Sequence, residues 1–105
     1  MTVKKTLEEA RFNLSLEHFD LDETLASLTN YIRRDILKLL DLHKRMRLME
    51  ITRALEVEDH TKVVFHLKTL KNSRIIRQQE KAYFLTTGGK EMLRALRLLE
   101  NHLPQ

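Results

Sequence analysis

Hydrophobic side chains recur with the period of an α-helix in the middle of the chain, and they predict the central helix of the core. The apolar positions of this stripe are Ile32, Ile36, Leu37, Leu39 and Leu40. The period continues through Leu42, and the side chain of Thr29 or Asn30 is placed to cap the start of the helix. This segment is the strongest helical pattern in the sequence, so the rest of the domain is expected to pack around it.

Two segments before this helix have weaker patterns. Residues 6–19 begin with a capping-box pattern and then alternate between apolar and polar side chains, so helix and strand both stay open there. Residues 20–28 begin with acidic side chains, which favour a helix N-terminus. Leu25 and Leu28 follow three positions apart, so this segment predicts a short helix.

Three segments connect the central helix to the next long one. Residues 43–47 have no hydrophobic period and carry mostly basic or titratable side chains, so we expect an exposed connection. Residues 48–55 return to the helical period and predict a short helix. Residues 56–58 then turn the chain.

Residues 59–72 predict a helix with one apolar face and one polar face. Val63, Leu67 and Leu70 form the apolar stripe, and the side chain of Asp59 is placed to cap the first turn. The opposite face carries Thr61, Phe65, Lys68, Thr69 and Asn72. This face has almost no negative charge. Its cation, two hydroxyls, amide and aromatic ring suit a surface that meets phosphates and base edges.

The remaining part of the chain predicts a β-hairpin and a final helix. Residues 75–78 and 82–86 are β-prone and flank a short polar loop at 79–81. The run Thr87-Gly88-Gly89 ends the second strand and begins the helix. Apolar side chains in that helix are spaced by four, three and four positions, at Met92, Leu96, Leu99 and Leu103. Leu93, Ala95 and Leu98 widen this stripe. Either its own domain or a second copy of the chain must cover it, and a chain of 105 residues favours the second copy.

The composition narrows the function classes. The chain has no cysteine, which excludes disulfides and thiolate metal sites, and no apolar run long enough to span a membrane. It lacks a signal-peptide core, so we expect a cytoplasmic protein. It also lacks metal-ligand spacings, a glycine-rich phosphate loop and a nucleophile in a recognisable setting, so we expect neither an enzyme nor a cofactor.

Positive charge is concentrated in one part of the chain. Residues 59–81 carry six Lys or Arg against two Asp or Glu, a net charge of +4, whereas residues 1–30 carry three against six, a net charge of −3. A basic stripe beside an acidic arm is typical of a module that places one face on a polyanion.

The order of elements predicts a fold that is mainly α with a small β-hairpin wing, a winged helix-turn-helix that dimerises through its terminal helices. Residues 1–28 would form an N-terminal arm and helix, residues 29–86 the winged helix-turn-helix, and residues 87–105 a C-terminal dimerisation helix. Four runs resemble the ArsR-type winged-helix regulators at residue level. They are Arg34-Asp35-Ile36-Leu37-Lys38-Leu39-Leu40, Glu50-Ile51-Thr52-Arg53-Ala54-Leu55, Val63-Val64-Phe65-His66-Leu67-Lys68-Thr69-Leu70 and Tyr83-Phe84-Leu85-Thr86, with Ile75-Ile76 before the last.

The resemblance implies a homodimeric transcriptional regulator of double-stranded DNA. In that family the terminal helices form the dimer interface, the recognition helices enter successive major grooves, and the wings reach the flanking minor groove or backbone. The sequence departs from the family at its effector sites. The thiolate metal motif is missing, and the Asp/His pairs of the last helix reduce here to Glu91 and His102. We therefore expect no metal, and the sequence does not identify an effector.

The predicted functional residues follow from this arrangement. The DNA-binding residues are Thr61, Lys62, Phe65, Lys68, Thr69, Lys71, Arg77 and Lys81, and the dimer interface consists of Met92, Leu96, Leu99 and Leu103. Gln78 in the wing, and Arg45 and Arg47 ahead of the helix-turn-helix, are further candidates for DNA contacts, whereas His66 is expected to be structural. Two alternatives remain: a winged-helix protein-interaction module of a transcription complex, and a sequence-neutral architectural DNA-binding protein.

Overall fold

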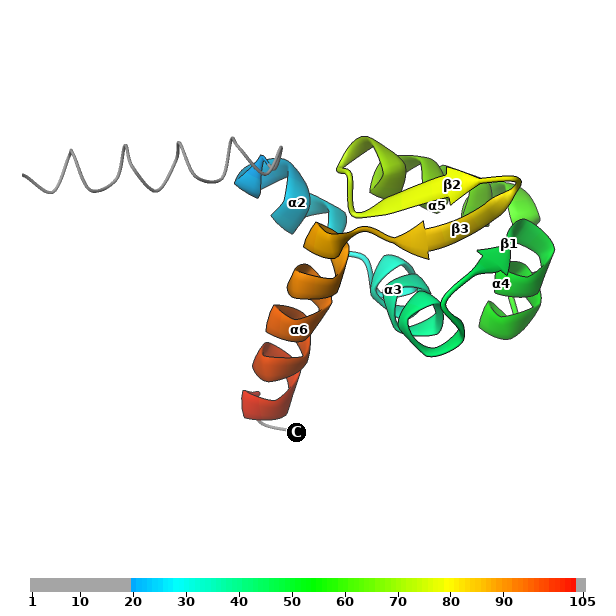
Figure 1. The fold of residues 1–105 in the computed structure, drawn as a ribbon. Helices are drawn as coiled ribbons and strands as arrows, with labels where there is room; N and C mark the ends of the chain where they lie inside the picture. Colours follow the sequence, from blue (N-terminus) through cyan, green and yellow to red (C-terminus); the bar gives the residue numbers. More distant parts are fainter. Residues whose placement is uncertain (1–19, 104–105) are drawn as a thin grey trace, which may run out of the picture.

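A computed structural model of the chain describes residues 20–103, and the predictions for residues 6–19 lie outside this range. Within it, five helices are combined with a small three-stranded antiparallel sheet (Figure 1). The helices are α2 (Leu21–Ser27), α3 (Tyr31–His43), α4 (Leu48–Leu55), α5 (His60–Asn72) and α6 (Thr87–His102), and the strands are β1 (Met46–Arg47), β2 (Ile76–Gln79) and β3 (Ala82–Leu85).

Helix α3 is the central helix that the apolar period predicted. The side-chain oxygen of Asn30 caps it by accepting hydrogen bonds from the backbone N–H groups of Ile32 and Arg33, at 2.9 and 3.2 Å. The apolar stripe of α3 packs against α4, α5, α6 and β3, and its fully buried members are Ile36, Leu37 and Leu40. The apolar period overestimates the buried length of the helix, because Leu42 is exposed.

The segment after α3 is largely exposed, as expected, but it also contains a short strand that the sequence did not predict. Met46 and Arg47 form strand β1 and pair with β3, so Met46 lies opposite Tyr83 and is only 6% exposed. A strand of two residues is too short to show an alternating pattern in the sequence. Because basic residues flank Met46, nothing in the sequence indicates that this one position is buried. The chain reaches this strand through a tight turn, in which the backbone N–H of Arg45 donates to the carbonyl of His43 at 2.8 Å.

The short helix predicted at residues 20–28 is confirmed as α2, with Asp20 as its cap. Its buried side chains are nevertheless Thr24 and Ser27, whereas Leu25 is 54% exposed. Leu28, which follows the helix, packs against the edge of the core. The spacing of two leucines therefore indicated the helix correctly but not the face that it buries.

The hairpin of β2 and β3 lies in the sheet order β1-β3-β2, so β3 is the central strand. Directly paired residues alternate between two faces: Ile76 and Leu85 point into the core, and Arg77 and Phe84 point outward. Gln79, which we expected in the loop, is the last residue of β2. The loop thus has two residues, both with positive φ, as a tight hairpin turn of this length requires.

Helix α6 starts directly after the hairpin, packs one side against α3 and extends away from the sheet (Figure 1). Thr86 caps it by accepting a hydrogen bond from the backbone N–H of Gly89 at 2.9 Å. Gly89 lies against the backbone of Ile75, and a Cβ atom at this position would be 2.1 Å from the Ile75 carbonyl oxygen. The start of α6 is therefore fixed against the segment that connects α5 to the hairpin.

The described part of the chain is mainly helical with a small antiparallel sheet, and this arrangement is compatible with a winged-helix fold. Helices α3, α4 and α5 pack on one another, and the hairpin follows α5 directly. Within residues 20–103, no helix combines the length and the apolar composition that crossing a bilayer requires.

Candidate nucleic-acid interface

Helix α5 has the two faces that its sequence predicted. Val63, Leu67 and Leu70 are fully buried, and the carboxylate of Asp59 accepts a hydrogen bond from the backbone N–H of Thr61 at 3.0 Å. The hydrogen bonds from the side chain and the backbone of Thr61 lower the pKa of Asp59, so the capping group stays charged. The outward face is therefore presented by a helix whose start and buried side are both well anchored.

The outward face of α5 carries cations and one aromatic ring. Lys62, Lys68 and Lys71 are all exposed, and within residues 20–103 none of them lies within ion-pair distance of a carboxylate. Phe65 is 62% exposed, and its ring meets the neighbouring His66 ring edge-on at 5.6 Å. The prediction that Phe65 points outward agrees with this placement. Lysines without an acidic partner in the described chain, beside an exposed ring, leave the face free to contact a polyanion.

The two hydroxyls predicted to meet base edges already donate hydrogen bonds within the protein. The hydroxyl of Thr61 donates to the Asp59 carboxylate at 2.6 Å, and that of Thr69 donates to the Phe65 carbonyl at 3.1 Å. A hydroxyl has one proton to donate and two lone pairs that accept. Both side chains therefore face outward as hydrogen-bond acceptors.

His66 lies on the inner side of α5 and is buried, as expected for a structural residue. Its Nδ1 atom lies 3.3 Å from a guanidinium nitrogen of Arg33 on α3, and the Nε nitrogen of Arg33 donates to the Ser27 carbonyl at 2.6 Å. Burial and then the nearby guanidinium lower the pKa of His66, because both disfavour a second positive charge. The neutral imidazole accepts from Arg33 and connects α5 to α3 and α2.

The C-terminal end of α5 is closed by a left-handed residue that is not glycine. Arg74 has φ 61°, its N–H donates to the Lys71 carbonyl, and the N–H of Ile75 donates to the Leu70 carbonyl, both at 3.0 Å. These two bonds form the Schellman motif, and the buried pair Leu70 and Ile75 supplies its hydrophobic contact. The helix therefore ends in the usual way, but Arg74 occupies the left-handed position that glycine normally takes.

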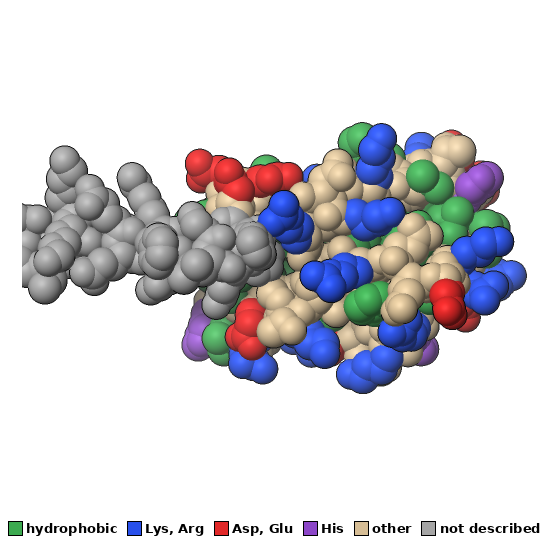
Figure 2. Space-filling view, turned by 45° about the horizontal axis from the view of Figure 1, so that its top comes forward, with side chains coloured by type: hydrophobic (Ala, Val, Ile, Leu, Met, Phe, Trp, Pro, Cys, Tyr) green, Lys and Arg blue, Asp and Glu red, His purple; other side chains and the backbone are tan. Residues whose placement is uncertain are grey.

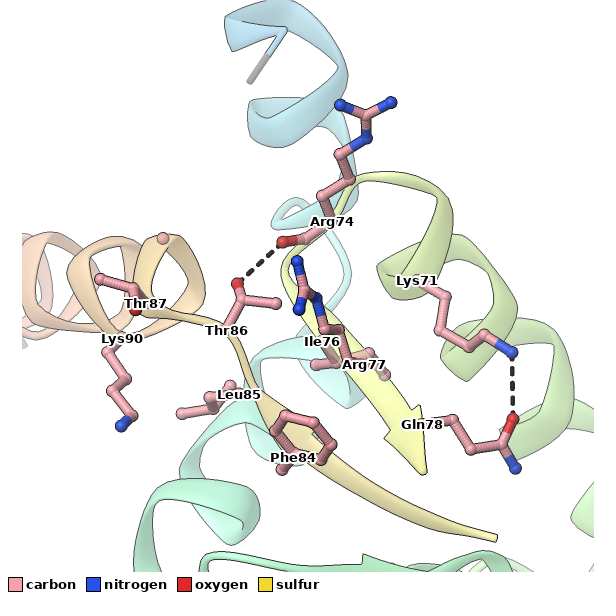
Figure 3. A pocket seen from close by; sticks show the side chains of 11 residues that line it. Lys71, Arg74, Ile76, Arg77, Gln78, Phe84, Leu85, Thr86, Thr87 and Lys90 are labelled. Carbon is pink, nitrogen blue, oxygen red and sulfur yellow. Dashed lines mark hydrogen bonds between the residues drawn. The ribbon is translucent and has the colours of Figure 1, made fainter. Parts of the chain in front are cut away.

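The hairpin lies beside the end of α5 and is tied to it by a side-chain contact. The ammonium of Lys71 donates to the amide oxygen of Gln78 at 3.0 Å (Figure 3). Arg77 lies on the outer face of the sheet, and Lys81 is in the two-residue turn at the tip. The structure thus brings the predicted helix and wing residues to neighbouring surfaces, with Lys71 and Gln78 at the boundary.

Sequence reasoning missed two residues near the wing. The Phe84 ring lies on the outer face of the sheet, with the Arg45 guanidinium carbon 4.5 Å from its centroid. Lys90, in the first turn of α6, lines the surface beside Phe84 and Leu85. The alternation in 82–86 could have placed Phe84 outward. The position of Arg45, however, depends on β1, which was not predicted.

The charge on this side of the molecule is predominantly positive. Figure 2 shows Lys and Arg side chains spread over the middle of the surface, while the acidic side chains lie mostly toward its ends. The three ion pairs within residues 20–103 involve Lys38, Arg94 and Arg97, and none involves a cation of α5 or of the hairpin. Cations without an ion pair in this part of the chain therefore gather where the sequence predicted the interface.

The predicted dimer residues differ in exposure. Met92 and Leu96 are half-buried, and Leu96 packs against the core of its own domain. Leu99 and Leu103 are 63% and 62% exposed, and Leu98 beside them is also exposed. Within the described part of α6, it is therefore the second half that presents apolar side chains to solvent.

Residues 20–103 contain no group of three or more His, Asp or Glu side chains placed to hold a metal ion. Residues 21–96 match the family described as a domain of unknown function, DUF7347. The match spans more than half of the chain, which therefore belongs to this family. A comparison with curated proteins finds no match.

Proposed function

We propose that this member of the DUF7347 family is a sequence-specific regulator of transcription that binds double-stranded DNA as a homodimer. Helix α5 would enter the major groove, and the hairpin would contact flanking DNA, as in winged helix-turn-helix proteins of the ArsR type that the sequence resembles. The observation that carries the proposal is the outward face of α5. It combines exposed lysines that pair with no described carboxylate with two threonine hydroxyls and a phenyl ring.

The chemistry of this face supports separate roles for its side chains. Lys62, Lys68 and Lys71 would contact phosphates, which would fix the register of the helix on the duplex. Thr61 and Thr69 are acceptors, so they would take hydrogen bonds from adenine N6 or cytosine N4, the donors that the major groove offers. Phe65 would meet a thymine methyl group or a sugar. From the wing, Arg77 and Lys81 would reach the backbone beside the groove.

The exposed apolar surface at the end of α6 supports the dimer. Leu98, Leu99 and Leu103 expose apolar surface that the described part of the domain does not cover, and a second copy of α6 would bury it. Two recognition helices joined in this way would read two half-sites about one helical turn apart, roughly 34 Å.

The proposal is tested by selecting duplexes from a random-sequence pool with the wild-type protein and titrating a labelled selected duplex by fluorescence anisotropy at several salt concentrations. Competitor-resistant binding with a steep salt dependence is expected. Lys68→Ala should weaken binding to all sequences and lower the salt slope by about 0.9 for each phosphate that it no longer neutralises, hence by about 1.8 in a dimer. Thr61→Ala should instead change which sequences are selected.

Lys38→Ala provides the matched control, because Lys38 is a lysine on α3 that is paired with Glu100 at 2.8 Å, away from α5. It should leave both affinity and salt slope unchanged. If Lys68→Ala behaves like this control, α5 is not the docking face. Binding that bulk competitor DNA abolishes would identify an architectural protein instead.

A protein-interaction module is the second candidate, and the exposed apolar side chains of the helix-turn-helix favour it. Met49, Val64 and Phe65 are each at least two-fifths exposed. Such residues suit a protein partner better than a phosphate backbone. If the wild-type protein enriches no duplex from the pool even at low salt, this candidate replaces the DNA proposal.

A further inference from the structure

The outer face of the sheet carries Arg77, already proposed as a wing contact, together with three side chains that the proposed function does not use. Here the name outer sheet face denotes Arg45, Arg77, Phe84 and Lys90. Arg77 lies directly opposite Phe84 in the β2–β3 pair, so the two side chains share the solvent side. Arg45 stacks on the Phe84 ring, and Lys90 approaches from the first turn of α6. Each of three cations from separate segments thus lines a hollow that Phe84 also lines.

Two hollows lie on either side of Phe84. The first extends between the hairpin and the start of α6, and its cationic side chains include Arg77 and Lys90 (Figure 3). The second lies toward the end of α3 and includes Arg45 and again Lys90. Among the described residues, no carboxylate lines the first hollow. Asp41 lines the second, but its carboxylate accepts from Arg97 at 3.1 Å.

The cations of the outer sheet face have no acidic partner among residues 20–103. Arg45 is also held in place, because a guanidinium that lies over an aromatic ring is attracted to the face of the ring. The N–H groups of the guanidinium that point away from the ring are left to donate to a ligand. Such an arrangement presents donors for the oxygens of a phosphate with little loss of side-chain freedom.

The first hollow is continuous with the outward face of α5. Lys71 belongs to that face and also lines the hollow, and its hydrogen bond to Gln78 joins α5 to β2 at the boundary. The cations therefore form one path from Lys68 through Lys71 to Arg77 and Lys90. A path of this kind, open along its length, fits a phosphate backbone better than a compact small anion.

We propose that the outer sheet face binds the phosphate backbone of the duplex outside the segment that α5 reads. This inference rests on the proposed function and extends it, because it adds Lys90 to the DNA contacts, places the sequence candidate Arg45 on the same surface and gives Phe84 a supporting role. The wing would then lie between two contacted parts of the backbone. Affinity would depend on DNA that flanks the recognised sequence, with little dependence on the base sequence of that flank.

The test combines a protein variant with a change of duplex length. The selected duplex is compared with the same duplex extended on each side by about one helical turn, roughly 10 base pairs. The wild-type protein should bind the extended duplex at least about tenfold more tightly at low salt. The double variant Arg45→Gln/Lys90→Gln should lose most of this gain while its affinity for the short duplex changes little.

The matched control is Arg94→Gln, which removes one cation from α6 that is already paired with Glu91. It should keep the full gain from the flank. Because Arg45 also packs on Phe84, the single variant Lys90→Gln is measured too, and circular dichroism melting checks that each protein is folded. If the extended duplex increases affinity as much for Lys90→Gln as for the wild-type protein, the inference is overturned but the proposed function stays intact.

A competition arm distinguishes the backbone from a free anion. Inorganic tripolyphosphate is titrated against each protein by isothermal calorimetry. Saturable binding that Lys90→Gln abolishes, together with an unchanged flank gain, would make the hollow a small-anion site and overturn the inference. Failure of the wild-type protein to enrich any duplex would remove the proposed function itself and this inference with it.

Discussion

The outward face of α5 and the junction between the hairpin and α6 are built in opposite ways. At the junction the polar groups are paired with one another: the single proton of the Thr86 hydroxyl is shared between the carbonyls of Arg74 and Ile75, at 2.8 and 3.0 Å, and the hydroxyl oxygen accepts from the N–H of Gly89. On the outward face of α5, Lys68 and its neighbouring lysines pair with no carboxylate in the described part of the chain.

The difference predicts which substitutions should change stability and which should change binding. Substitutions at the junction change atoms that fit against one another, so they should alter the free energy of unfolding. Substitutions on the face should alter affinity for a ligand and leave the fold unchanged, since exposed side chains without partners contribute little to folding. We therefore expect a substitution at the junction to change the free energy of unfolding alone, and a substitution on the outward face to change affinity alone.

The largest expected effect is at the junction. Gly89→Ala would place a Cβ atom 2.1 Å from the carbonyl oxygen of Ile75, and this backbone oxygen cannot move aside without shifting the connection to β2. We expect a loss of about 3 kcal/mol in the free energy of unfolding, at the upper end of overpacking effects. Urea denaturation followed by circular dichroism measures it.

Gly88→Ala is the matched control, because it changes the adjacent position in the same helical turn. Higher helix propensity alone should raise the stability there by about 0.5–1 kcal/mol. If Gly89→Ala unfolds at the same urea concentration as the wild-type protein, the close approach of α6 to Ile75 is wrong, and the junction is no more tightly fitted than the outward face of α5.

Thr86→Val should have a smaller effect at the same junction. The substitution keeps the size of the side chain but removes the hydroxyl that caps α6 and donates to the α5–β2 connection. A loss of about 1–2 kcal/mol is expected, which is the usual range for removing a helix cap. Thr86→Ser keeps the hydroxyl and should retain most of the stability. Thermal unfolding of both variants would show whether the hydroxyl or the methyl group matters.

The sequence predicted these two regions unequally well. The helical period and the capping side chains predicted α3, α4 and α5 and placed Val63, Leu67 and Leu70 in the core, because one apolar face of a long helix is a repeated pattern. The outward face of α5 is the complement of that pattern, so it could be predicted too. Its proposed role in DNA binding remains a prediction.

The junction and the outer sheet face could not be predicted in the same way. They depend on contacts between segments far apart in the sequence, such as Met46 with Tyr83 and Gly89 with Ile75. Local signals were also missing where the chain turns. Residues with positive φ are normally glycine or asparagine, but here they are Lys44, Glu56, Arg74, Glu80 and Lys81. The turns at residues 56–58 and 79–81 were predicted, but side chains that usually avoid this conformation conceal which residues adopt the positive φ.

The smallest expected effect concerns His66, which lies between the core and the outward face of α5. Burial and Arg33 lower its pKa in the folded protein below the value of about 6.5 in the unfolded chain. The unfolded chain therefore binds the proton more readily, so this group contributes stability above about pH 6.5, which declines as the pH falls through the lower pKa of the folded state. Protonation would also turn the acceptor Nδ1 of His66 into a donor facing the Arg33 guanidinium.

We expect the free energy of unfolding, measured in urea at pH values from about 7.5 down to about 5, to fall more steeply in the wild-type protein than in His66→Gln. Glutamine keeps an acceptor for Arg33 but does not titrate. His60→Gln is the control, since His60 is exposed at the start of the same helix, and it should keep the pH dependence of the wild-type protein. Equal slopes in all three proteins would show that the contact with Arg33 does not couple α5 to the core, and that His66 behaves like a residue of the outward face.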